Sequence, residues 1–165
     1  MRRLVAPAFA ICAALLVGAQ VPAQQSAPIP PLPPTTPYGT PITLDQAKRA
    51  ADAAEAEAKK RNMTMAIAIV EPSGDLVYFR RMDGTQYASA KVAQSKAVSA
   101  ALFRRTTKSF RERVAQGDLS PMALVGAVAS DGGVPIVMDG KIIGAISVSG
   151  GADDPVVQAG ADALK

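Results

Sequence analysis

The segment VPIVMDGKIIGAISVSG, residues 134–150, constrains the fold more than any other part of the chain. Asp139 and Gly140 separate two runs rich in β-branched residues, and Asp-Gly is a favoured two-residue turn between antiparallel strands. A second hairpin is predicted upstream, where MTMAIAIV and LVYFRR flank the turn residues EPSGD. The sequence therefore predicts an antiparallel sheet built from two β-hairpins.

Two long helical segments accompany these hairpins. In residues 42–62, Thr43 as N-cap and Gln46 three residues later form a capping box, and alanines recur at helical spacing. Residues 87–104 are apolar around nearly the whole circumference of the predicted helix. Such a helix is buried on more than one side, which in so small a domain favours a partner subunit.

Two shorter helices complete the prediction. One covers residues 106–116, and the last begins with Asp154 as N-cap and Pro155 at the first helical position. The resulting order is α-β-β-α-α-β-β-α. Helices that group between and after two hairpins predict an α+β fold with an antiparallel sheet and flanking helices, not a parallel βαβ fold.

The N-terminal part is predicted to lie outside this domain. Residues 1–23 have the basic start, short apolar stretch and small-residue site of a secretory signal peptide, which predicts a periplasmic or secreted location. That stretch is too short to span a membrane, and no later one is longer, so no membrane span is expected in the mature form. Residues 24–41 hold seven prolines and predict an extended arm, as a spacer, a docking ligand or a strap along a neighbouring subunit. Residues 42–165 then form a single domain.

Composition removes several classes of chemistry. The chain has no histidine, and its one cysteine, Cys12, lies in the predicted signal peptide. Ser-His-Asp and Cys-His catalysis, a structural zinc site and His-ligated haem are therefore excluded from the mature protein. Without the two arginines of the signal peptide, 16 basic residues remain against 14 acidic ones. No basic cluster is interleaved with aromatic residues, so nucleic acid is not expected as a partner.

Lys96 is the candidate catalytic residue. Its helical neighbours Val92, Ala93 and Ala100 are apolar, so the lysine leaves a largely apolar surface. It is either a desolvated base or nucleophile, or a lysine whose ammonium group reaches solvent along its apolar stem.

Arg80, Arg81 and Asp83 lie where the second predicted strand runs into a turn. The two guanidinium groups could clamp a carboxylate or propionate, or they could form surface ion pairs with Asp83 or Glu71. Met82, beside them, could line a flat apolar ligand, whereas methionines within the first strand favour the core.

The glycine-rich corner at residues 150–151 is not predicted to hold a phosphate. It lacks the Gly-Lys-Ser/Thr ending of a P-loop, and Asp153 and Asp154 follow at the helix start, where their charges would repel a phosphate. The two glycines instead allow the backbone to approach a neighbour closely.

Taken together, the segments ITLDQAKRAADAAEAEA, MAIAIVEPSGDLVYFRRMDG, AQSKAVSAALF and GGVPIVMDGKIIGAISVSGG, with the terminal DD and AGADAL, resemble the GlcG/HbpS family. That family also includes the C-terminal domain of PduO-type proteins. The resemblance covers the chain from Ile42 to its end, in order and with similar spacing. It implies an α+β domain that assembles into homo-oligomers, from dimers to octamers, and binds haem or a related tetrapyrrole.

The resemblance also implies the position of a ligand pocket. Its polar residues would be Glu71, Arg80, Arg81, Met82, Asp83 and Lys96, framed by Gly132, Gly133, Ser149, Gly150, Gly151 and Asp154. The chain departs from the family at the histidine that ligates haem in PduO-type members, which has no counterpart here. Ligation through Tyr87 or Met82, or binding without an axial ligand, remains open.

The leading hypothesis is an exported oligomeric haem-binding protein that acts as a carrier or sensor. One alternative is an enzyme on a small anionic or carbonyl substrate, with Lys96 as base or Schiff-base lysine and Arg80 and Arg81 holding a carboxylate. The other is a structural oligomer whose ligand pocket is vestigial.

Overall fold

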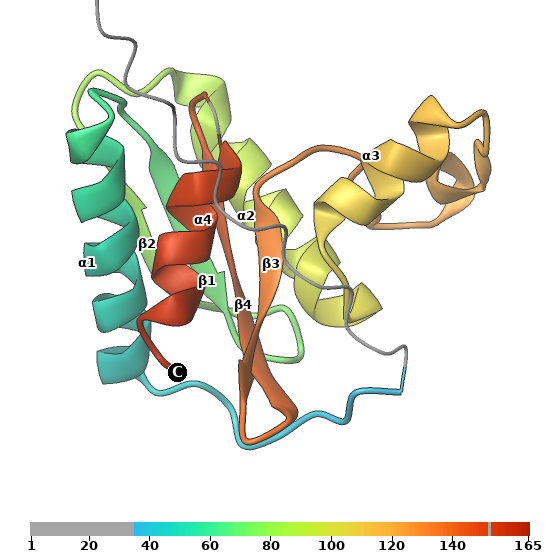
Figure 1. Ribbon diagram of the computed structural model, residues 1–165, viewed down its shortest axis with the longest axis horizontal. Coiled ribbons are helices and arrows are strands. Elements are labelled where there is room, and N and C mark those ends of the chain that lie inside the picture. Colours follow the sequence, from blue (N-terminus) through green and yellow to red (C-terminus); the bar gives the residue numbers. More distant parts are fainter. Residues whose placement is uncertain (1–34, 152) are drawn as a thin grey trace, which may run out of the picture.

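The computed structural model describes residues 35–151 and 153–165, and it confirms the predicted α+β class and element order (Figure 1). The signal peptide and most of the proline-rich segment lie outside the described residues. Among the residues described, no helix is both long and apolar enough to cross a membrane. The elements are α1 (Leu44–Lys60), β1 (Ala66–Val70), β2 (Leu76–Arg81), α2 (Tyr87–Phe103), α3 (Thr107–Ala115), a 3-10 turn η1 (Ser120–Ala123), β3 (Gly133–Met138), β4 (Lys141–Ser149) and α4 (Asp153–Asp162).

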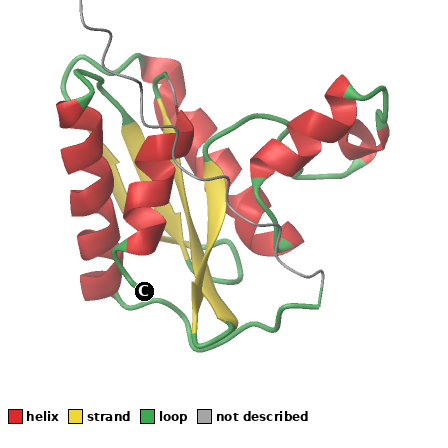
Figure 2. Ribbon diagram, in the orientation of Figure 1, coloured by secondary structure: helices red, strands yellow, loops and turns green. Residues whose placement is uncertain are grey.

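Both predicted hairpins join in one sheet of four antiparallel strands, in the order β2-β1-β4-β3. The helices α1 and α4 cover one face of the sheet and α2 covers the other, so the domain has three layers (Figure 2). The first strand begins at Ala66, so Met63, Thr64 and Met65, which the sequence placed in the strand, precede it.

The two faces of the sheet carry side chains of different size. Along β1, Ile67 and Ile69 face α1 and α4, whereas Ala66 and Ala68 face α2. This alternation follows from the two-residue repeat of a strand. Because alanines of α2 pack against alanines of the sheet, this helix lies close to the strands. The interface therefore leaves little room for larger side chains.

The helix α4 starts two residues earlier than predicted. It begins at Asp153, so Asp154 lies in its first turn and is not the N-cap. The Asp153 carboxylate accepts a hydrogen bond from the Gly151 N–H at 3.2 Å and forms an ion pair with Lys96. These two contacts hold Asp153 at the start of the helix. Pro155 is then the third helical residue, where its missing N–H still leaves no helical bond broken.

The end of the proline-rich segment packs against its own domain. The N–H of Gly39 donates to the Ile142 carbonyl at 2.8 Å, and the Pro37 carbonyl accepts from the Ile142 N–H at 2.9 Å. The Tyr38 hydroxyl donates to the Ala101 carbonyl at 2.9 Å, at the C-terminal end of α2. This stretch therefore extends the sheet beyond the end of β1. The Tyr38 hydroxyl adds a second donor to the Ala101 carbonyl, which also accepts from the Arg104 N–H at 3.4 Å.

Replacing Tyr38 with phenylalanine should lower the free energy of unfolding by about 1 kcal/mol, because the hydrogen bond between this stretch and the last turn of α2 is lost while the ring remains. Urea unfolding of the two proteins would measure the difference. Equal unfolding midpoints and slopes would mean that water replaces the hydroxyl without loss.

Candidate functional site

Most of the predicted pocket residues gather at one end of the sheet. Ala66, at the start of β1, pairs with Arg81 at the end of β2 and with Ser149 at the end of β4, and Gly133 at the start of β3 lies at the same end. Glu71 does not belong to this group, because it lies in the β1–β2 turn at the opposite end of the hairpin. There Glu71 Oε1 accepts a hydrogen bond from the Ser73 hydroxyl at 2.9 Å.

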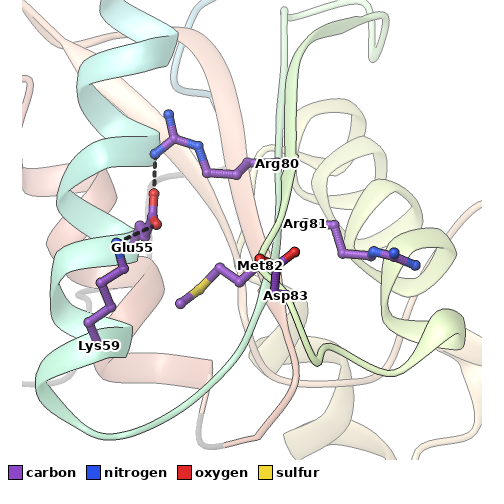
Figure 3. Close-up of a pocket in the computed structure, with 6 residues that line it drawn as sticks. All are labelled: Glu55, Lys59, Arg80, Arg81, Met82 and Asp83. Atoms are coloured by element: carbon purple, nitrogen blue, oxygen red, sulfur yellow. Dashed lines mark hydrogen bonds and ion pairs between the residues drawn. The ribbon is translucent and has the colours of Figure 1, made fainter.

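Arg80 and Arg81 point to opposite faces of the sheet, as Figure 3 shows. Arg80 reaches α1, where it pairs with Asp52 at 2.8 Å and with Glu55. Arg81 reaches α2, and its guanidinium carbon lies 5.2 Å from the centre of the Tyr87 ring. The predicted ion pairs with Asp83 or Glu71 are not formed by either arginine within the described residues. Their side chains also diverge too far to clamp one small carboxylate.

The positive charge of Arg80 is already balanced by the carboxylates of Asp52 and Glu55, so Arg80 has a structural role. Burial acts to lower the pKa of its guanidinium, but hydrogen bonds with Tyr78, Asp52 and Glu55 outweigh that effect and raise it. The hydrogen bond from Lys59, with the charge of Arg80, holds the pKa of the Glu55 carboxyl below its usual value. These contacts join α1 to the edge strand β2 and leave Arg81 as the cation available to a ligand.

A cavity of about 410 Å³ opens beside this edge, and its lining residues appear in Figure 3. The predicted residues Met82 and Asp83 line it, with Glu55 and Lys59, which the sequence did not indicate. The sulfur of Met82 accepts a hydrogen bond from the Met65 N–H at 3.4 Å, so it is held against the core. The remaining lining residues are Arg80 and Arg81.

Lys96 does not reach solvent, so the interpretation as a snorkelling lysine is wrong. It is 1% exposed, and its ammonium group donates to Asp153 Oδ2 at 2.6 Å and to the Asp131 carbonyl at 2.7 Å. Burial raises the pKa of the Asp153 carboxyl, and the hydrogen bond from Lys96 opposes that shift. The result is a buried ion pair between α2 and the start of α4.

Two surface ion pairs continue this contact toward α3. Lys108 pairs with Asp154 at 2.8 Å, and Arg111 pairs with Asp131 at 2.6 Å. The hydrogen bond to Asp154 raises the pKa of the Lys108 ammonium group. Asp154 therefore tethers α3, and it does not line the cavity at the end of β2.

The glycine corner lies against its own chain. A Cβ atom on Gly150 would collide with the Thr64 carbonyl and would lie 2.9 Å from the Met65 sulfur, and the methyl group of Met63 packs against Gly151. The expected close approach is confirmed, and the neighbour is the segment that leads into β1.

Two buried hydroxyl groups flank Tyr87 in sequence and were not indicated by any motif. Thr85 Oγ1 and Ser89 Oγ have no hydrogen-bond partner within the described residues. Tyr87 itself is 85% exposed. Serine and threonine are common throughout the chain, so only the folded structure identifies this pair.

Residues 42–163 match the family described as "Haem degrading protein HbpS-like". Protein GlcG of Escherichia coli strain K12 is 40% identical over 97 residues, which are 59% of this chain and 72% of GlcG. The crystal structure of Klebsiella pneumoniae protein ORFY aligns with a TM-score of 0.72 and 27% identity, over 81% of this chain and 97% of that one. The crystal structure of a double mutant of Streptomyces reticuli HbpS aligns with a TM-score of 0.70 and 28% identity, over 86% of this chain and 99% of that one. These matches confirm the resemblance found in the sequence, and the chain belongs to the HbpS-like family.

Proposed function

We propose that the protein binds haem or a related tetrapyrrole, as an exported carrier or sensor. The observation that carries the proposal is Arg81, an exposed cation without a carboxylate partner among the described residues, stacked on the exposed ring of Tyr87. A guanidinium group suits a haem propionate, and an aromatic ring suits the edge or face of a macrocycle. The membership of a family described as haem degrading favours this ligand over other carboxylates.

The donor set decides how such a ligand would be held. The chain has no histidine, and the Met82 sulfur already accepts a hydrogen bond. The residues therefore do not fit histidine ligation, and the Met82 sulfur is already engaged with the main chain. They fit a propionate at Arg81 and an oxygen ligand beside it.

The geometry does not favour the alternative enzyme. A Schiff-base or general-base lysine must reach its substrate, but Lys96 is 1% exposed and donates to two groups of its own chain. It also lies outside the cavity lined by the arginines. Lys96 is therefore assigned a structural role.

Assembly into a homo-oligomer is part of the proposal. The segment that contains η1 projects from the body of the domain (Figure 1). Several large apolar side chains in and beside η1 are exposed. Exposed apolar patches of this kind mark contact surfaces. The residues are Leu119, Met122, Leu124 and Val125.

A hemin titration tests the proposal. The purified protein should give a saturable Soret shift, and Arg81→Gln should bind roughly tenfold more weakly because a charge-assisted contact is lost. Arg104→Gln is the matched control, since Arg104 stacks on the Tyr38 ring near the other end of α2. A spectrum identical to that of free hemin would contradict the proposed function. Equal losses in both variants would remove Arg81 from the site.

A further inference from the structure

The described residues offer few donors for haem iron. Histidine is absent from the sequence, and the only cysteine lies in the predicted signal peptide. The sulfurs of Met82 and Met138 accept hydrogen bonds from the Met65 N–H and the Gln46 amide, and Met65 is fully buried. An iron bound at the end of β2 would therefore find no histidine or cysteine and no free sulfur among these three methionines, which leaves exposed oxygen atoms among the candidate ligands.

The three tyrosines of the chain differ in the state of their hydroxyl groups. The Tyr38 hydroxyl donates to main-chain carbonyls at the end of α2, and the Tyr78 hydroxyl accepts from Arg80 at 2.8 Å. Tyr87 is 85% exposed, and its hydroxyl has no hydrogen-bond partner among the described residues. Tyr87 is thus the tyrosine whose oxygen is free to bind a metal.

The surroundings of Tyr87 suit an anionic oxygen. The guanidinium carbon of Arg81 lies 5.2 Å from the ring centre, so its positive charge can balance a phenolate. Tyr87 is also the first residue of α2, where the positive end of the helix dipole favours negative charge. Tyrosinate is an established haem ligand in proteins, as in catalase.

We infer that Tyr87 is the axial ligand, binding ferric haem iron through its phenolate oxygen, with Arg81 balancing the phenolate charge. The inference rests on the proposed haem-binding function. The hydroxyl proton passes to solvent as the iron–oxygen bond forms, and no electron is transferred. Lys96, on the buried side of the same helix, takes no part.

Resonance Raman and electron paramagnetic resonance spectra of the ferric hemin complex test this assignment. The purified protein should show a high-spin signal and tyrosinate ring modes that shift when tyrosine is ring-deuterated. Tyr87→Phe should lose those modes and bind hemin on the order of tenfold more weakly or worse, as metal-site changes do. Tyr38→Phe is the matched control, because an arginine also stacks on that ring but its hydroxyl is occupied, and it should keep the modes.

The possible results distinguish a failure of the ligand assignment from a failure of the proposed haem binding. A saturable Soret shift without tyrosinate modes, or modes that persist in Tyr87→Phe, would overturn the ligand assignment and leave haem binding in place. The absence of any saturable shift in the unmodified protein would overturn both. Because the Tyr87 ring is exposed, Tyr87→Phe should unfold within about 0.5 kcal/mol of the parent, and circular dichroism would verify that it is folded.

Discussion

Replacing Lys96 with methionine should lower the free energy of unfolding by about 3–5 kcal/mol, because the change leaves a buried carboxylate without its cation. The side chains of Lys96 and Asp153 are 1% and 11% exposed, so water cannot replace the lost partner easily. Methionine has a similar length and keeps most of the packing, which confines the effect to the charge. Urea unfolding followed by circular dichroism would give the difference.

The matched control is Lys108→Met, which breaks the neighbouring ion pair at the surface. Lys108 and Asp154 are 38% and 36% exposed, and pairs of this kind contribute about 0–1 kcal/mol. A double variant, Lys96→Met with Asp153→Leu, removes both buried charges and should recover much of the stability. If Lys96→Met were no more damaging than Lys108→Met, the buried pair would not hold α2 to α4.

The loss caused by Lys96→Met should also depend on pH. Burial raises the pKa of the Asp153 carboxyl above its usual value near 3.8, and Lys96 opposes that rise. A raised pKa means that the folded chain binds the proton more tightly than the unfolded chain. The stability that comes from this proton is fully present at pH below the pKa of the unfolded chain, and it is lost as pH rises through the raised pKa of the folded chain. Without Lys96 this effect grows, so the variant should lose less stability at about pH 4 than at about pH 7.

Local sequence signals predicted the elements of the fold well. Asp139 and Gly140 have φ of 51° and 70°, the left-handed conformation that a tight hairpin turn of this type requires. The capping box also formed, with the Gln46 N–H donating to the Thr43 hydroxyl at 3.2 Å. These features depend on residues within a few positions of one another, so a single sequence contains the information.

The candidate site was predicted less completely because its contacts are long-range. Lys96 and Asp153 are 57 positions apart, and nothing in either segment indicates that they meet. The divergence of Arg80 and Arg81 could have been predicted from the sequence, however, because neighbouring residues on a strand face opposite sides of the sheet. The position of Glu71 could have been predicted as well, because a residue in a hairpin turn lies at the opposite end of the hairpin from the free ends of its strands.

Gly132→Ala should destabilise the fold by about 2–5 kcal/mol, which combines a left-handed backbone cost of roughly 1–2 with an overpacking cost of roughly 1–3. Gly132 has φ of 97°, and a Cβ atom there would lie 2.5 Å from the Asp153 Cβ and 2.8 Å from Lys96 Nζ. The substitution therefore forces apart the ion pair that joins α2 to α4. Urea unfolding would measure the loss.

Gly126→Ala separates the two costs, because Gly126 has φ of 84° but no atom within 4 Å of the added Cβ. Its loss should stay at about 1–2 kcal/mol, the backbone cost alone. Combining Gly132→Ala with Lys96→Met should then cost less than the two single losses together, because both act on the same ion pair. If the two losses in unfolding free energy were strictly additive, the effect of Gly132→Ala would not act through the Lys96–Asp153 ion pair.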